Sequence, residues 1–168
     1  MAIKGDDYFA ELYVAGVLAR AGWNVYFPHR DEGFDFIISK LVEGKIVIRP
    51  VQVKGKYPEP NKTDKPVYGY IGQLTQKHPE MVLAIPYFAV DRAGTPPQFI
   101  AYMPPRQIKP HKRGCRCLPA EFKEGCPKPR KYYSRFMNED GIKLLESNDW
   151  NNLEIADPLE SEAQYAEP

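Results

Sequence analysis

The alternation of apolar and polar positions along the first hundred residues predicts one helix followed by several short strands. Residues 6–21, DDYFAELYVAGVLARA, indicate a helix that Asp6 can cap and that Gly22 would end. After a Pro-rich stretch, residues 67–78 indicate a second, short helix. Short apolar runs bounded by turn residues predict strands at 23–27, 34–38, 45–54, 81–90 and 98–103.

The expected order of elements is therefore α-β-β-β-α-β-β, which places the chain in the α/β class. Residues 81–90 form the most apolar run, so we expect them to be a central strand. We divide the chain into a core at 1–105, a basic segment with a short helix packed on the core at 106–150, and an acidic, loose tail at 151–168. Residues 104–135 are expected to be irregular.

Composition fits one globular domain, because the chain has 168 residues of which 43% are hydrophobic and 27% are charged. No apolar run approaches the ~20 residues of a membrane helix, and no signal peptide is visible at the N-terminus. The three cysteines do not make a closed disulfide framework. These observations predict a cytoplasmic protein with no membrane partner.

Charge is distributed unevenly although the net charge is only +1. Residues 106–135 hold ten Lys or Arg and two acids, while residues 139–168 hold nine acids and one Lys. A basic segment of this kind suits a phosphate-facing surface. A solvated loop would have the same composition.

The hairpin expected over residues 33–56 places polar side chains where a core strand would have none. With a turn centred on Glu43-Gly44, paired residues sum to 87, and Asp35 lies across from Gln52. Lys54 shares that face of the sheet, since side chains alternate along a strand. A bulge at Pro50 would shift this register.

A carboxylate beside an amide oxygen suits a divalent cation such as Mg²⁺, whose shell water completes. The metal would polarise a phosphodiester and acidify a bound water, and a neighbouring Lys would stabilise developing charge. The alternative is an exposed strand end with an ordinary Asp–Lys contact.

These residues resemble the PD-(D/E)XK nuclease superfamily, which includes restriction enzymes and Holliday-junction resolvases. Its signature is an acid on an opening helix, an Asp on one hairpin strand and (D/E)-x-K on the next. Glu11 matches the helical acid, Asp35 the strand Asp, and Gln52-Val53-Lys54 the last element. The resemblance implies a restriction-endonuclease-like αβββαβ core, a mixed central sheet flanked by helices, over residues 6–90.

The resemblance to this superfamily also implies Mg²⁺- or Mn²⁺-dependent hydrolysis of DNA. Asp35, Gln52, the carbonyl of Val53 and Glu11 would bind the metal, and Lys54 would assist the water nucleophile. Two positions depart from the pattern: Phe34 replaces the motif Pro, and Gln52 replaces an acid, which should weaken metal binding. The nearby Asp31, Glu32 and His29 are expected to be turn residues; Gln73, Gln76 and Lys77, in the expected second helix, are expected to be surface residues.

The basic segment contains a second constellation of potential ligands. His111, Cys115, Cys117 and Cys126 could bind Zn²⁺, although their spacing matches no common zinc pattern and unligated thiols are the alternative. The expected contacts to DNA come from this segment and are Lys112, Arg113, Arg116, Lys128, Arg130 and Lys131. Tyr132 and Tyr133 could stack on bases or pack internally.

Three functions therefore remain open from the sequence: a DNA endonuclease, for which a homodimer would suit cutting of both strands; a non-catalytic nucleic-acid- or partner-binding module on the same fold; and a zinc-stabilised interaction protein.

Overall fold

The computed structural model describes residues 4–30, 32–58, 70–89 and 95–158. Within these ranges the chain forms an α/β structure built on a mixed five-stranded sheet in the order β1-β2-β3-β5-β6. The pairs β1/β2, β2/β3 and β5/β6 are antiparallel, and β3/β5 is parallel. The prediction of an α/β fold with a mixed central sheet is confirmed at this level.

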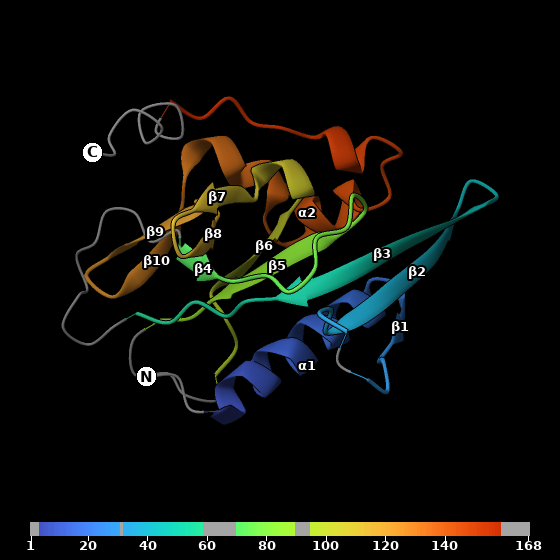
Figure 1. Cartoon of the computed structure of the whole chain (residues 1–168), viewed down its shortest axis with the longest axis horizontal. Helices are drawn as coiled ribbons and strands as arrows, with labels where there is room; N and C mark the ends of the chain where they lie inside the picture. Colours follow the sequence, from blue (N-terminus) through green and yellow to red (C-terminus); the bar gives the residue numbers. More distant parts are fainter. Residues whose placement is uncertain (1–3, 31, 59–69, 90–94, 159–168) are drawn as a thin grey trace.

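The first half of the chain supplies the long helix and this sheet, and Figure 1 shows α1 lying along the strands. Asp6 and Asp7 lie in the first turn of α1, where the helix dipole favours negative charge. The elements are α1 Lys4–Arg20, β1 Asn24–Tyr26, β2 Phe36–Val42, β3 Lys45–Val53, β5 Val82–Tyr87 and β6 Phe99–Met103.

The core lies where this sheet meets α1 and the C-terminal elements. Every residue of β5 is buried, so the predicted central strand is confirmed between β3 and β6. Ala10, Val14 and Leu18 of α1 bury the helix face that is turned to the sheet. No helix in the described part of the chain has the length and apolar character needed to cross a membrane.

The predicted helix at 67–78 is wrong wherever it can be compared with the structure. Residues 67–69 lie outside the described residues, and 70–78 contain the short strand β4, Tyr70–Gly72, and no helix. β4 pairs with β8 rather than with its neighbours in sequence. Gly114 of β8 permits this pairing, because a Cβ there would lie 2.5 Å from the carbonyl oxygen of Gly72.

Residues 104–135, expected to be irregular, are largely ordered into short elements. A three-stranded sheet has the order β4-β8-β7, and β9 pairs with β10 in a separate hairpin. The elements are η1 Pro105–Gln107, β7 Lys109–His111, β8 Gly114–Arg116, β9 Ala120–Lys123, β10 Cys126–Pro129 and η2 Lys131–Phe136. The predicted short helix after this segment is confirmed as α2, Asn138–Leu144.

The C-terminal residues, expected to be a loose tail, are held against the body as far as Pro158. After η3, Trp150–Asn152, the carboxylate of Asp157 is buried and forms an ion pair with Arg130. Glu154 forms an ion pair with Lys109. Acids near the C-terminus thus neutralise part of the basic segment, which composition alone did not reveal.

Candidate functional site

The β2–β3 hairpin has the predicted turn and register. Glu43 and Gly44 have φ values of 48° and 79°, as a tight two-residue turn between antiparallel strands requires. Paired residues run from Val42↔Lys45 to Phe36↔Val51, so that every pair sums to 87. The ladder remains in register through Pro50, without a bulge.

Asp35 lies just beyond the last pair of this ladder, at the base of the hairpin. Its N–H donates to the carbonyl oxygen of Val51 at 2.9 Å. Its carboxylate Oδ2 accepts two hydrogen bonds, from Gln52 Nε2 at 2.9 Å and from the Val53 N–H at 2.6 Å. The structure therefore brings Asp35 and Gln52 together, as the hairpin register predicts.

The backbone of β3 turns Val53 toward Asp35. The Lys54 N–H donates in the opposite direction, to the carbonyl oxygen of Ala84 on β5, at 3.0 Å. Because the N–H and C=O of one strand residue point to the same edge, the Val53 carbonyl also points to the β2 side. A backbone oxygen thus lies beside the Asp35 carboxylate, where the resemblance implies a metal ligand.

Glu11 completes the cluster from the middle of α1. Partial burial raises the pKa of its carboxyl to about 7, assisted by the charge of Asp35, a hydrogen bond to Asp35 and the charge of Asp7. Lys54 acts in the opposite direction and favours the charged carboxylate. All four predicted residues, Glu11, Asp35, Gln52 and Lys54, therefore interact in one place, and Glu11 is not freely solvated, as expected.

Tyr57 is a positioning residue that sequence reasoning missed. Its hydroxyl donates to the carbonyl oxygen of Asp6 at 3.0 Å, and its ring stacks on Phe88 with centroids 4.5 Å apart. Burial raises the pKa of this hydroxyl to about 12. These contacts join the chain just after Lys54 to the start of α1, which carries Glu11. The available signal was a lone aromatic directly after the K-G-K triplet.

The loop before Asp35 packs against the segment 73–78. Gly33 has a φ of 93°, and a Cβ there would lie 3.1 Å from the side chains of Thr75 and Gln76. Gln76 is exposed, as predicted, but it lies against the loop that carries Asp35. His29 and Glu32 are exposed, and Asp31 lies outside the described residues.

The donor set at this cluster fits a hard divalent cation. Two carboxylates, one amide and one backbone carbonyl are oxygen donors of the kind that Mg²⁺ binds together with water. Among the described residues no group of three or more His, Cys, Asp or Glu side chains is placed to hold a metal. A metal here would therefore depend on Glu11, Asp35, neutral oxygens and water. A cavity of about 740 Å³ lies elsewhere, between α1, Lys40 and α2.

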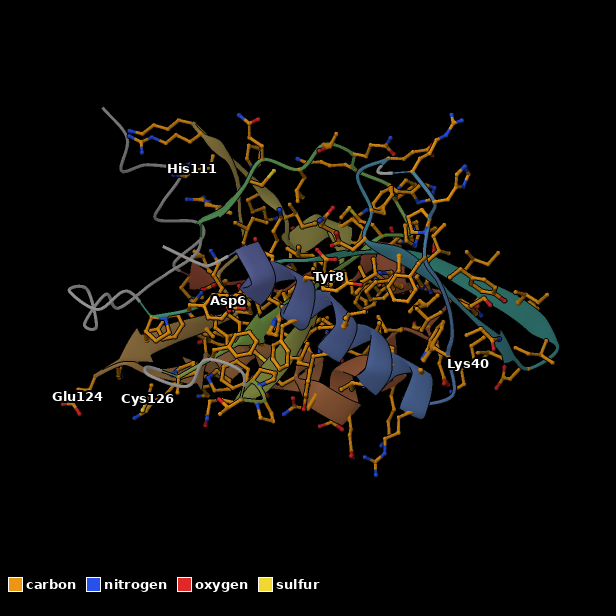
Figure 2. The ribbon with its side chains drawn as sticks, turned by 90° about the horizontal axis from the view of Figure 1, so that it is seen from below. Asp6, Tyr8, Lys40, His111, Glu124 and Cys126 are labelled. Carbon is orange, nitrogen blue, oxygen red and sulfur yellow. The ribbon has the colours of Figure 1, made fainter. Side chains whose placement is uncertain are left out.

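The structure does not bring the four predicted zinc ligands into one site. His111 lies on β7 and Cys115 on the adjacent β8, whereas Cys126 begins β10 in a different sheet. Figure 2 shows His111 and Cys126 on opposite sides of the molecule. Cys115 and Cys117 are buried, Cys126 is exposed, and none of the three forms a disulfide. The ordering of this segment comes from strand pairing instead.

The cations predicted to contact DNA differ in their surroundings. Arg130 is held internally, because its guanidinium donates to the carbonyl oxygen of Leu118 at 2.6 Å and to Asp157 at 2.7 Å. Its guanidinium is thus turned to the protein interior, and a contact of Arg130 with DNA remains a prediction. Tyr133 is buried and donates to Asp157, whereas Tyr132 is half-exposed. Arg116 is partly buried, and the exposed cations are Lys112, Arg113, Lys128 and Lys131.

Comparison of the chain with family models, curated proteins and solved structures finds no match.

Proposed function

We propose that this protein is a divalent-metal-dependent nuclease that hydrolyses DNA phosphodiester bonds, with a PD-(D/E)XK-like site in which Gln52 replaces the acid. The observation that carries this proposal is the position of Asp35. Its carboxylate accepts hydrogen bonds from Gln52 and Val53 and lies beside the carboxyl group of Glu11. Two adjacent carboxyl groups with a lysine nearby form an arrangement that folding alone disfavours.

Each residue of the cluster has a distinct role in this proposal. Asp35 and Glu11 hold the metal, and the oxygens of Gln52 and Val53 complete the protein's share of the ligands. When bound, the metal supplies Lewis-acid polarisation of the phosphate and lowers the pKa of water. Lys54 orients the attacking water and stabilises the charge that develops on the phosphate oxygens. Tyr57 fixes α1 relative to β3, so that Glu11 remains within reach of Asp35.

Gln52 sets the expected strength of metal binding. An amide offers one oxygen and no charge, so the site has two carboxylates where the family pattern has three. Glu11, whose pKa is raised to about 7, would hold a cation as the carboxylate, so that its proton would compete with the metal. Metal affinity is therefore expected to rise with pH between about 6 and 8.

A second candidate function is a nucleic-acid- or partner-binding module on the same fold without catalysis. The observation that favours it is the hydrogen bond from Gln52 Nε2 to Asp35, because this bond satisfies Asp35 without a metal. The two functions differ in whether Mg²⁺ or Mn²⁺ binds and in whether phosphodiester bonds break.

The test is cleavage of supercoiled, linear, single-stranded and branched DNA with Mg²⁺ or Mn²⁺. Wild type is compared with Asp35→Asn, Lys54→Ala and the matched control Lys143→Ala, which removes an exposed lysine of α2 away from the cluster. We expect cleavage by wild type and by the control. Loss of at least 100-fold in rate is expected for Asp35→Asn and Lys54→Ala, since each removes a group that acts on the reacting phosphate.

DNA binding without cleavage by wild type in either metal would overturn the nuclease proposal and favour the binding module. Equal loss of activity in Lys143→Ala would show that the site has been placed wrongly. Circular dichroism of each variant separates a loss of folding from a loss of chemistry.

A further inference from the structure

The distal part of the β2–β3 hairpin projects beyond the rest of the central sheet, as Figure 1 shows. β1 pairs only with residues 37–39 of β2, and β5 pairs only with residues 51–53 of β3. Between these ladders, residues 40–47 pair only with each other, and residues 48–50 pair only with residues 37–39 of β2 among the described strands. We call this stretch the hairpin arm.

The outer face of the hairpin is apolar and exposed. Leu41 is 69% exposed, Ile46 is 70% exposed and Ile48 is 56% exposed. Tyr26 of β1 pairs with Ile37, and both contribute exposed surface at the base of the arm. Because side chains alternate, the outward positions from β2 and β3 carry no charge. They are Ile37, Ser39, Leu41, Ile46, Ile48 and Pro50.

Within residues 36–50, the cations of the hairpin lie on its other face. Lys40 forms an ion pair with Glu146, and Arg49 is buried, donating to the carbonyl oxygens of Leu145 and Ser147. Nucleic acid is therefore a poor occupant of the outer face, because binding to phosphates requires exposed Lys or Arg. The outer face suits an apolar protein surface instead.

The exposed apolar face of such an arm is expected to pack against another protein surface. A two-stranded hairpin is marginally stable by itself in water, and exposed strand edges beside apolar side chains favour association. The exposed apolar side chains of this face present on the order of 500 Å². With a polar rim, this approaches the ~800 Å² that each partner contributes to a stable interface.

We propose that the outer face of the hairpin packs against the same face of a second copy of this chain. A two-fold interface places a patch on its own equivalent, and a flat face without charge meets its copy with no like-charge repulsion. Two such sheets pack about 10 Å apart, with their side chains interdigitated. The occupant is a second copy because the size and neutrality of the face match what an isologous dimer requires.

The same face of β3 continues from the apolar positions to Gln52 and Lys54. Six residues separate Ile48 from Lys54, a strand length of about 20 Å. A dimer formed here therefore places two candidate sites close to one interface, as a protein that cuts both strands of a duplex requires. That consequence rests on the proposed function, whereas the dimer itself does not.

The test is sedimentation equilibrium of the full chain from 1 to 200 µM. Wild type is compared with the double variant Ile46→Thr/Ile48→Thr and with the control Tyr132→Thr, which removes an exposed aromatic from η2. Threonine retains the β-branched shape that strands favour, so the arm should still form. We expect wild type and the control to reach twice the mass of one chain. The double variant should dissociate with a Kd at least tenfold weaker.

Hydrogen exchange provides a second readout on the same proteins. The arm amides of wild type should exchange more slowly at high than at low protein concentration, and those of the double variant should show no such dependence. A wild-type protein that remains monomeric at 200 µM would overturn the proposal. A mass that grows beyond two chains, or a double variant that dimerises as wild type does, would also overturn it. None of these outcomes depends on cleavage, so failure of the dimer is distinguishable from failure of the nuclease.

Discussion

At the base of the β2–β3 hairpin, the carboxyl groups of Asp35 and Glu11 lie side by side, whereas Arg130 of the basic segment, residues 106–135, forms a buried ion pair with Asp157. Partial burial of Glu11 and the charge of Asp35 beside it raise the pKa of Glu11. Arg130 and Asp157 satisfy one another, with Tyr133 donating to the same carboxylate at 2.7 Å. Like charges held together cost stability and indicate a binding site, while paired buried charges indicate structure.

The largest loss of stability is expected from breaking the buried ion pair between Arg130 and Asp157. Asp157→Ala leaves the buried guanidinium of Arg130 without its carboxylate, so we expect a loss of about 3 kcal/mol in the free energy of unfolding. Urea denaturation measures it. Glu154→Ala is the matched control from the same segment; its pair with Lys109 is exposed, so a change within about 0.5 kcal/mol is expected. Equal effects in the two variants would show that burial does not distinguish the pairs.

A smaller effect, on Mg²⁺ affinity, is expected from Gln52→Glu, which adds a third carboxyl group to the cluster of Glu11 and Asp35. A third carboxylate beside Asp35 should tighten Mg²⁺ binding about tenfold, because each added charge attracts the cation. Isothermal titration calorimetry measures the affinity, and Gln73→Glu, an exposed position outside the cluster, is the control. Unchanged Mg²⁺ affinity would place the cation elsewhere or exclude it from this cluster.

The smallest effect is expected from Glu11→Gln in the absence of metal. The folded-state pKa of Glu11 is raised from 4.5 to about 7, so wild type loses stability as pH rises through this window. The variant lacks this loss, and we expect it to be about 1 kcal/mol more stable at pH 8 and equal to wild type at pH 4, after allowance for solvent screening. Thermal unfolding at the two pH values measures the difference, with Glu139→Gln on α2 as control. A difference independent of pH would contradict the carboxyl coupling.

The hairpin could be predicted because its determinants are local. Glu43-Gly44 specifies the turn, the turn fixes the register, and the register brings Asp35 to Gln52 within twenty residues of sequence. The proximity of Glu11 to Asp35 was predicted from the family resemblance and not from any local sequence pattern. Tyr57, which fixes that approach, was missed because its partner Phe88 lies thirty-one residues later, beyond a Pro-rich stretch of sequence.

The second half of the chain could not be predicted in the same way. β4 forms because Gly72 and Gly114 approach closely across more than forty residues, and neither glycine identifies its partner in the sequence. His111 and the three cysteines left a zinc site open as one alternative, in a segment that strand pairing orders. The charge of Arg130 indicated nucleic acid because its partner Asp157 lies in a stretch whose composition predicts a tail.

The order of Arg130, Tyr133 and Asp157 along the chain also affects how the protein is made. Arg130 and Tyr133 are synthesised well before the carboxylate that both of them need, and their polar groups can be buried only after it arrives. Because one core joins α1, the central sheet and the C-terminal elements, we expect this core to close only after Asp157 has left the ribosome. Truncation before Asp157 would therefore leave Arg130 and Tyr133 without their shared partner inside a core that has already been synthesised.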